Sequence, residues 1–278
     1  MVYNKIELKN HFDFIKVDEN PTLEIYLPYN MCEMRRENNK RPCMLVLPGG
    51  GYGMCSERES EPIALRFLPE GYNVFVLTYS VAPKKFPTQL REVAASMELI
   101  YENADKWNCD TSKIAIMGFS AGGHLAAHYS TMFECKEVRE VLPESKCVNA
   151  SVLCYPVISA DMGIAHQGSI INVIGHEPEN KTEENYFSCN KCVSDKTPPA
   201  FLWHTADDTC VPVQNSFLYA QALISRNIPV EMHIYPFGNH GLSTCDKETC
   251  DNVTTEIAHN ARWIDDCIKW LELIWNKA

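Results

Sequence analysis

The chain lacks the features of several large classes of protein. It has 25 Lys and Arg against 36 Asp and Glu, a net charge of −11, and its basic residues are scattered. Nucleic acids and anionic membranes need basic patches, so we exclude both as partners. No apolar run approaches the length of a transmembrane helix. Internal repeats and low-complexity segments are also absent, and 278 residues suffice for one large domain with a substantial core.

A disulfide framework is lacking as well, although the chain has 13 cysteines, an odd number without short, regular spacing. The N-terminal residues Met1–Lys5 carry no apolar h-region, so we expect no signal peptide and a reducing, cytoplasmic location. Cys189 and Cys192 form a lone C-x-x-C, and no second pair offers the further ligands of a zinc site. We therefore expect no metal, and we expect Cys154 and Cys267, which stand in apolar patterns, to be core residues.

A serine motif is the most informative feature that is present. Residues 118–122 read Gly-Phe-Ser-Ala-Gly, directly after the apolar run 114–117 and before a segment suited to a helix. The flanking glycines give a tight strand-to-helix corner the room it needs, and the corner exposes the hydroxyl. This context predicts Ser120 as a nucleophile; on the motif alone, a glycine-rich turn with an incidental serine is the alternative.

A glycine run upstream offers the backbone donors that such a nucleophile requires. The apolar segment 44–47 leads into Pro48 and then into three consecutive glycines. The N–H groups of Gly50, Gly51 and Ala121 are the expected oxyanion donors. Hydrolases usually carry His where Pro48 stands, but the donors are backbone groups, so the difference need not remove them. A plain glycine turn is the alternative for this segment.

The downstream half offers an acid and a base. The apolar segment 201–204 is followed by Asp207 and Asp208, and the alternating segment 230–235 leads to His240 between glycines. A carboxylate and a histidine after late strands are the partners that a serine nucleophile needs. The order Ser, Asp, His along the chain is that of the α/β hydrolases, not that of the chymotrypsin or subtilisin folds.

Together these segments resemble the α/β-hydrolase esterases of the acetyl-esterase and acetyl-xylan-esterase type, which include small cytoplasmic sugar-ester hydrolases. The resemblance extends from about residue 20 to the C-terminal helix. Members of this family carry the acid shortly before Val-Pro, and the pair at residues 211–212 therefore selects Asp208 over Asp207. The resemblance implies a catalytic triad of Ser120, Asp208 and His240, with Asp207 left as a loop carboxylate.

The resemblance also implies an activity. We expect a serine carboxylic-ester hydrolase that forms an acyl-enzyme and acts on short-acyl, chiefly acetyl, esters of sugars or small alcohols. The partner would be a small-molecule ester, no cofactor would be needed, and a homo-oligomer stays open. An amide-cleaving relative, such as an aryl formamidase or a small prolyl-oligopeptidase-type peptidase, is the alternative, because the triad does not separate ester from amide. A non-catalytic binding protein of the same fold usually loses a triad member, whereas here all three are present.

Alternating strand and helix patterns predict an α/β fold with a mostly parallel central sheet flanked by helices, forming a single domain over residues 1–278. Besides the strands that bear the motifs, we expect strands at 23–27, 74–77 and 151–155 and helices at 59–67, 90–108, 213–225 and 257–275. One long polar segment, 160–199, interrupts the alternation. We expect a small cap there with short helices at 168–175 and 183–187, the alternative being a surface excursion without substrate contact.

Three further polar residues need an interpretation. Glu59 and Glu61 follow the glycine loop; they could stabilise it, but we favour a role in the first turn of the following helix. His124 lies four residues after Ser120 on the expected helix, and we favour a structural, buried histidine over one that acts in the site.

Overall fold

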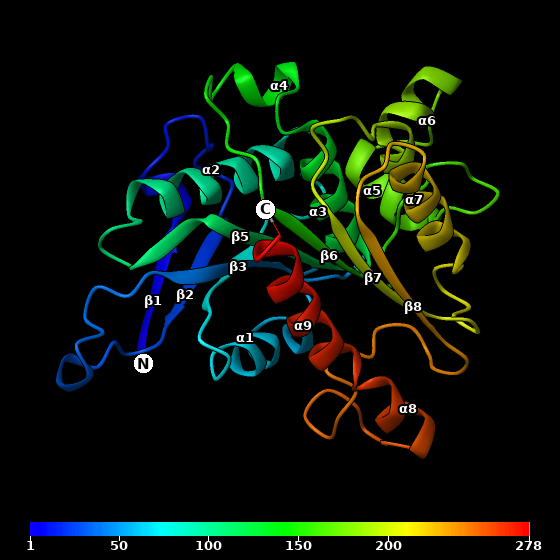
Figure 1. Cartoon of the computed structure of the whole chain (residues 1–278). Coiled ribbons are helices and arrows are strands. Elements are labelled where there is room, and N and C mark those ends of the chain that lie inside the picture. The colour runs from blue at the N-terminus through cyan, green and yellow to red at the C-terminus, as the bar shows by residue number, and fades with distance from the viewer. Residues whose placement is uncertain (278) are drawn as a thin grey trace.

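The computed structural model describes residues 1–277 and shows a central β-sheet with helices on both faces (Figure 1). The strands in chain order are β1 (Val2–Glu7), β2 (Thr22–Leu27), β3 (Arg41–Leu47), β4 (Asn73–Thr78), β5 (Cys109–Phe119), β6 (Ala150–Cys154), β7 (Ala200–Thr205) and β8 (Val230–Tyr235). Their order in the sheet is β1-β2-β4-β3-β5-β6-β7-β8. The β1–β2 and β2–β4 pairs are antiparallel and all others are parallel. This confirms the α/β-hydrolase fold expected from the sequence.

The helices fall into two layers, with α2, α3 and α7 above the sheet and α1 and α9 below it in the view of Figure 1. Their bounds are α1 (Glu61–Phe67), α2 (Thr88–Glu102), α3 (Ala121–Met132), α4 (Lys136–Arg139), α5 (Gln167–Ile174), α6 (Lys181–Phe187), α7 (Gln214–Ile224), α8 (Thr255–Asn260) and α9 (Trp263–Trp275). Short 3-10 turns lie at Leu8–Asn10, Cys32–Met34, Glu57–Glu59 and Cys189–Lys191.

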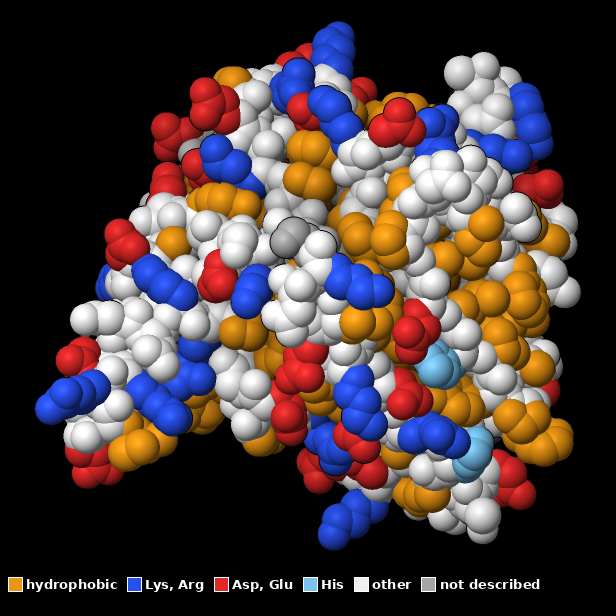
Figure 2. All heavy atoms as spheres, viewed as in Figure 1, with side chains coloured by type: hydrophobic (Ala, Val, Ile, Leu, Met, Phe, Trp, Pro, Cys, Tyr) orange, Lys and Arg blue, Asp and Glu red, His pale blue; other side chains and the backbone are white. Residues whose placement is uncertain are grey.

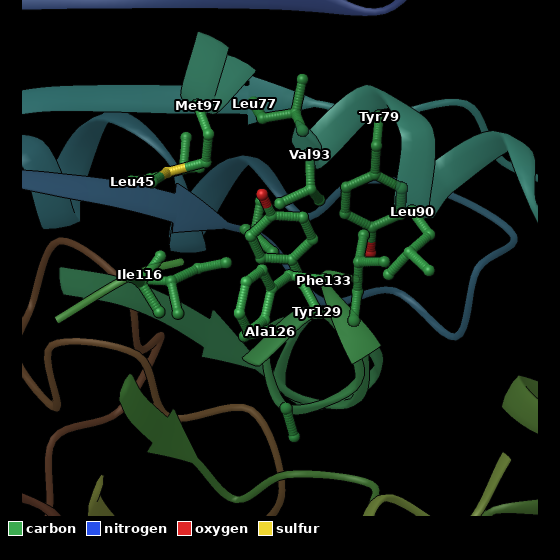
Figure 3. Close-up of a cluster of buried hydrophobic side chains, with 14 of the residues drawn as sticks. Leu45, Leu77, Tyr79, Leu90, Val93, Met97, Ile116, Ala126, Tyr129 and Phe133 are labelled. Atoms are coloured by element: carbon green, nitrogen blue, oxygen red, sulfur yellow. The ribbon is translucent and has the colours of Figure 1, made fainter. Parts of the chain in front are cut away.

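The strand periodicity explains why the sheet has a core on each face. Successive side chains of a strand point to opposite faces. Leu45 and Leu47 of β3 accordingly pack in the core beneath α2 and α3, whereas Met44 and Val46 pack in the core against α1 and α9. Figure 3 shows the first of these cores, where side chains of β3, β4 and β5 meet those of α2 and α3. Because the parallel strands are buried on both faces, they read as continuous apolar runs.

The register of the parallel strands brings distant loops together. Leu47 pairs with Gly118, Phe119 with Cys154, Cys154 with Trp203, and Thr205 with Tyr235. The carboxyl ends of β3, β5, β6, β7 and β8 therefore lie along one edge of the sheet. In open parallel sheets this is the edge at which ligands bind.

The structure corrects several expected boundaries. The helix expected at 59–67 begins only at Glu61, because residues 57–59 form a 3-10 turn. The helix expected at 90–108 spans Thr88–Glu102 and ends there, where the side chain of Asn103 donates to Leu99 O. The helix expected at 257–275 is two helices, α8 and α9, separated at residues 261–262.

The segment 160–199, expected to hold a small cap, contains α5, α6 and one 3-10 turn between β6 and β7. Both short helices lie within two residues of their expected bounds. Gly175, which ends α5, has a φ of 98°, the left-handed conformation that commonly terminates a helix.

The surface and the cysteines carry few special features. On the face in Figure 2, Lys and Arg side chains are interspersed with Asp and Glu. Within residues 1–277, no helix is long and apolar enough to span a bilayer.

All 13 cysteines are free thiols, and Cys154 and Cys267 are fully buried, as expected. No group of three or more His, Cys, Asp or Glu in the described part of the chain could hold a metal ion, and this includes the surroundings of Cys189 and Cys192.

Candidate active site

Ser120 forms the corner between β5 and α3. Its φ of 53° and ψ of −117° lie outside the regions that L-residues usually occupy, and such strain is often found at functional sites. The flanking glycines permit the corner: a Cβ at Gly118 would lie 2.1 Å from Gly122 O, and a Cβ at Gly122 would lie 2.2 Å from Leu47 O. The site residue is thus held where the N-terminus of α3 meets the end of β3.

The structure brings Ser120, His240 and Asp208 into one hydrogen-bonded chain. Ser120 Oγ lies 2.8 Å from His240 Nε2, and His240 Nδ1 lies 2.6 Å from Asp208 Oδ2. Because an ionised carboxylate only accepts, Nδ1 carries the proton, and Nε2 is free to accept the Ser120 hydroxyl proton. Ser120 follows β5, Asp208 follows β7 and His240 follows β8, so all three meet at the carboxyl edge of the sheet.

Asp208 is buried and held on both carboxylate oxygens. Its Oδ1 accepts the N–H groups of Cys210 and Val211, each at 2.9 Å, and His204 Nε2 lies 3.3 Å from Oδ2. Burial alone raises the pKa of Asp208, but the hydrogen bonds from His204, His240 and Val211 and the charge of His240 outweigh it. The pKa of Asp208 therefore lies well below its usual value, and the carboxylate is ionised across the neutral range.

The neighbouring carboxylate has a different role. Asp207 is exposed, and its Oδ1 accepts the N–H of Gly238 at 2.8 Å. It ties the loop after β7 to the loop before His240 but does not contact the imidazole by any hydrogen bond among residues 1–277.

The glycine run lies directly over Ser120. A Cβ on Gly49 would lie 3.0 Å from Ser120 Cβ, while Gly50 and Gly51 have φ values of 120° and 65°, where a side chain would be strained. Within residues 1–277, the N–H groups of Gly50, Gly51 and Ala121 donate no hydrogen bond. These are the three expected oxyanion donors. By contrast, Gly49 N–H is occupied, because it donates to Glu59 Oε2 at 2.8 Å.

The buried His124 of α3 links this helix to the loop of the glycine run and to the segment expected to be a cap. Its Nδ1 lies 2.8 Å from the hydroxyl of Tyr52, and its Nε2 lies 2.9 Å from Phe187 O in the expected cap. Burial lowers the pKa of His124 to about 4, so the imidazole is neutral. Nε2–H then donates to Phe187 and Nδ1 accepts from Tyr52. This is the structural role that we favoured from the sequence.

Helix α5 packs onto the glycine run. The Asn172 side chain donates to Gly51 O at 2.8 Å, and His166 Cε1 lies 3.8 Å from the position of a Cβ on Gly51. His166 Nδ1 lies 2.7 Å from Ser169 Oγ and also accepts Ser169 N–H, which leaves the proton on Nε2. Burial and the charge of His240 lower the pKa of His166. The segment expected to be a cap therefore contacts the site.

Two residues at the site were interpreted wrongly or not at all. We favoured a helix-turn role for Glu59, but its carboxylate is buried beneath the glycine run and binds Gly49 N–H. Tyr155, the last residue of the strand expected at 151–155, lies beyond the end of β6 with a φ of 36°, and its ring packs at 5.0 Å against the imidazole of His240. Their positions depend on contacts between distant segments, which no local pattern encodes.

With this geometry established, comparisons with known proteins give three findings. Residues 23–223 match the protein family described as BD-FAE. The chain is 38% identical over 233 residues to endo-1,4-beta-xylanase B of Butyrivibrio fibrisolvens and 34% identical over 209 residues to an acetylxylan esterase of Xylanibacter ruminicola. These matches cover 80% and 74% of the chain but only 36% and 42% of the two relatives, so the chain spans less than half of their length.

Solved structures match along nearly their whole length. An acetyl ester-xyloside bifunctional hydrolase from Caldicellulosiruptor lactoaceticus is 36% identical with a TM-score of 0.84, and the match covers 98% of this chain and 96% of that one. An α/β hydrolase, MGS-M1, from a deep-sea metagenome is 32% identical with a TM-score of 0.77 and covers 99% and 98%.

Proposed function

Because the chain belongs to the BD-FAE family of α/β hydrolases, we propose that it is a serine carboxylic-ester hydrolase for short-acyl, chiefly acetyl, esters of sugars or small alcohols. The observation that carries this proposal is the hydrogen-bonded chain from Ser120 through His240 to Asp208, at 2.8 and 2.6 Å. Relatives and solved structures named acetylxylan esterase and acetyl ester-xyloside hydrolase support the acetyl-ester substrate.

The geometry supports a two-step acyl transfer. His240 Nε2 takes the proton of Ser120 as Oγ attacks the ester carbonyl, and Asp208 stabilises the imidazolium that forms. His240 then donates this proton to the leaving alkoxide, which departs as the alcohol and leaves Ser120 acylated. Water enters, His240 takes its proton, and attack on the acyl-enzyme releases the carboxylic acid and restores Ser120. No step requires a metal or an organic cofactor.

The unoccupied backbone donors support stabilisation of the oxyanion. Ala121 N–H lies at the first turn of α3, whose N-terminus carries a partial positive charge, and Gly50 and Gly51 directly follow Gly49, whose Cβ would lie 3.0 Å from Ser120 Cβ. Removing one donor from such a site costs on the order of 3 kcal/mol of transition-state stabilisation.

The enclosure of Ser120 supports a small acyl group. Ser120 is only 7% exposed, and α5 covers the glycine run through Asn172 and His166. We propose that this cap forms part of the acyl or alcohol pocket, with the Nε2–H of His166 as a free donor toward the substrate, since it makes no hydrogen bond within residues 1–277.

A polar hollow beside His240 supports a hydroxyl-rich alcohol. The hollow has a volume of about 800 Å³ and is lined by His240, Arg58, Asn239 and residues of the loop 247–254. The leaving alcohol lies next to the group that protonates it, so it would be placed on the His240 side of the site.

We propose the cytoplasm as the location, because 13 free thiols persist in a reducing compartment.

The test is hydrolysis of p-nitrophenyl esters from acetate to decanoate, followed by acetylated xylo-oligosaccharides and a p-nitroanilide. We expect turnover of the acetate and propionate that falls beyond the butyrate, and release of acetate from the sugar esters. Ser120→Ala should abolish turnover while keeping the fold, and the exposed Ser225→Ala is the matched control. Near-native rates in Ser120→Ala would refute the proposal, and preferential cleavage of the anilide would favour an amide-cleaving enzyme instead.

A further inference from the structure

Glu59 is a buried carboxylate with no cationic partner. It is 2% exposed, and no Lys, Arg or His within residues 1–277 lies within ion-pair distance of it. Burying a carboxylate costs free energy unless hydrogen bonds satisfy it, so the two hydrogen bonds that Glu59 accepts must compensate for its burial. Those partners are Gly49 N–H at 2.8 Å on Oε2 and the Tyr155 hydroxyl at 2.6 Å on Oε1.

The first contact orients the glycine run. A Cβ on Gly49 would lie 2.7 Å from Glu59 Oε2, so the close approach of the carboxylate requires glycine at this position. Because Gly49 N–H points to Glu59, it is unavailable to an oxyanion, and the next two peptide units are left to provide donors. The direction of the Gly49 peptide thus determines where Gly50 and Gly51 present their N–H groups.

The second contact reaches the loop that carries His240. The Tyr155 hydroxyl donates to Glu59, and its oxygen accepts Ser243 N–H at 3.0 Å. The Ser243 hydroxyl in turn donates to Arg58 O at 2.5 Å. The Tyr155 ring meets the His240 ring edge-on, with centroids 5.0 Å apart. Burial and the Glu59 carboxylate raise the pKa of Tyr155 well above its usual value, so the phenol keeps its proton and remains a donor.

We propose that Glu59 is a positioning residue that links the two halves of the active site, holding the glycine run through Gly49 and the His240 loop through Tyr155 and Ser243. This inference rests on the proposed function, since it assigns Gly50 and Gly51 as oxyanion donors. Glu59 touches neither Ser120 nor His240 by hydrogen bond; its effect on hydrolysis passes through the two loops.

The test uses two substitutions that separate the two contacts. Glu59→Gln keeps the shape but replaces one of the two carboxylate oxygens by an NH2 group, so the two atoms that face Gly49 N–H and the Tyr155 hydroxyl can no longer both accept. Tyr155→Phe removes the hydrogen bonds of the phenol to Glu59 and to Ser243 N–H, and it leaves the contact of Glu59 with Gly49 N–H in place. Glu57→Gln, which changes an exposed glutamate of the same 3-10 turn, is the matched control.

We expect Glu59→Gln to lower kcat on p-nitrophenyl acetate by about 10- to 100-fold with little change in KM, the signature of a misplaced site. Tyr155→Phe should lower kcat by a smaller factor than Glu59→Gln does. In the Glu59→Gln background the effect of Tyr155→Phe should be smaller than in the wild-type background, because both changes break the same link. Labelling of Ser120 by a fluorophosphonate, which needs no known substrate, should slow in parallel. A purely structural role would lower the melting temperature without these changes in the folded enzyme.

The outcomes distinguish this inference from the proposed function. Wild-type rates of turnover and of labelling in folded Glu59→Gln and Tyr155→Phe would overturn the positioning role and leave the esterase proposal intact. Labelling that persists in Ser120→Ala would overturn the esterase proposal. Should Glu59→Gln fail to fold, the comparison of Tyr155→Phe with wild type still decides, because that variant removes one hydroxyl and keeps the ring against His240.

Discussion

Asp208 Oδ2 lies 2.6 Å from His240 Nδ1, whereas the carboxylate of Asp207, the residue before it, accepts the N–H of Gly238 at 2.8 Å instead. Adjacent carboxylates in one loop are thereby assigned to different tasks. Asp208 can hold the imidazole in the tautomer that accepts from Ser120, and Asp207 can only fasten two loops.

Paired substitutions test this assignment. We predict that Asp208→Asn lowers kcat by about 10³- to 10⁴-fold, because the amide no longer favours the tautomer with a proton on Nδ1. Asp207→Asn, the matched control, should lower kcat by less than about tenfold, since it weakens a single hydrogen bond at an exposed position. Steady-state kinetics on p-nitrophenyl acetate would check both. A larger loss in Asp207→Asn would show that the acid has been misassigned.

The packing of α3 against β3 predicts a strong effect of one methyl group. In Gly122→Ala the new Cβ would lie 2.2 Å from Leu47 O and 2.3 Å from Pro48 O, so the helix and the strand would have to separate. We expect a loss of about 3 kcal/mol in the free energy of unfolding, measured by urea denaturation.

Gly168→Ala is the control for this change. Its Cβ would meet no atom closer than His166 Cε1 at 3.6 Å, which is ordinary contact, and it lies in α5, where alanine favours the helix. The free energy of unfolding should stay the same or rise by up to about 1 kcal/mol. Equal losses in both variants would contradict the interpretation.

The position of His166 predicts a change in substrate binding. His166→Ala removes a free Nε2–H donor at the edge of the glycine run, and we expect KM for the preferred ester to rise about fivefold with a smaller change in kcat. His176→Ala changes an exposed histidine just after α5, and it should leave both constants unchanged. Unaltered KM values in His166→Ala on every ester tested would mean that the cap does not contact the substrate.

Two buried histidines predict loss of stability in acid. Burial lowers the pKa of His124 to about 4 and that of His128 to about 3, from an ordinary value of 6.5. The unfolded chain therefore binds protons below pH 6.5 that the folded chain does not. The stabilisation is complete above pH 6.5 and is lost progressively as the pH falls toward 4 and 3.

His128→Leu isolates one of these protons, because His128 Nε2 is buried without a partner among residues 1–277. Between pH 6 and pH 4.5 the slope of the unfolding free energy against pH should decrease by about 1.4 kcal/mol per pH unit, the value for one proton. Denaturant titrations over this range would measure it. An unchanged slope would mean that His128 is protonated in the folded protein.

Much of the fold could be predicted because its signals are local. The strands that precede Ser120 and Asp208 carry buried apolar runs, the strand before His240 alternates polar with apolar residues, and glycine or aspartate stands in the loops that follow. The same local signals located α5 and α6 within two residues.

The errors arise where tertiary contacts decide. β1 was missed because Val2–Glu7 lies exposed at the sheet edge and mixes polar with apolar residues. The break between α8 and α9 falls at Ala261 and Arg262, where neither glycine nor proline marks it. Glu59 binds Tyr155, 96 residues away, so its role could be recognised only from the folded chain.

The place of β8 in the sheet has a consequence for how the protein loses function. β8 lies at the edge of the sheet beside β7, and five of its six residues are partly exposed, whereas Ser120 follows β5 in the sheet interior. Fraying at this margin would withdraw His240 while the corner at Ser120 stays folded. Amide protons of β8 should then exchange with solvent faster than those of β5. Mild denaturant should inactivate the protein before its global unfolding transition, so inactivation and unfolding would be separate events.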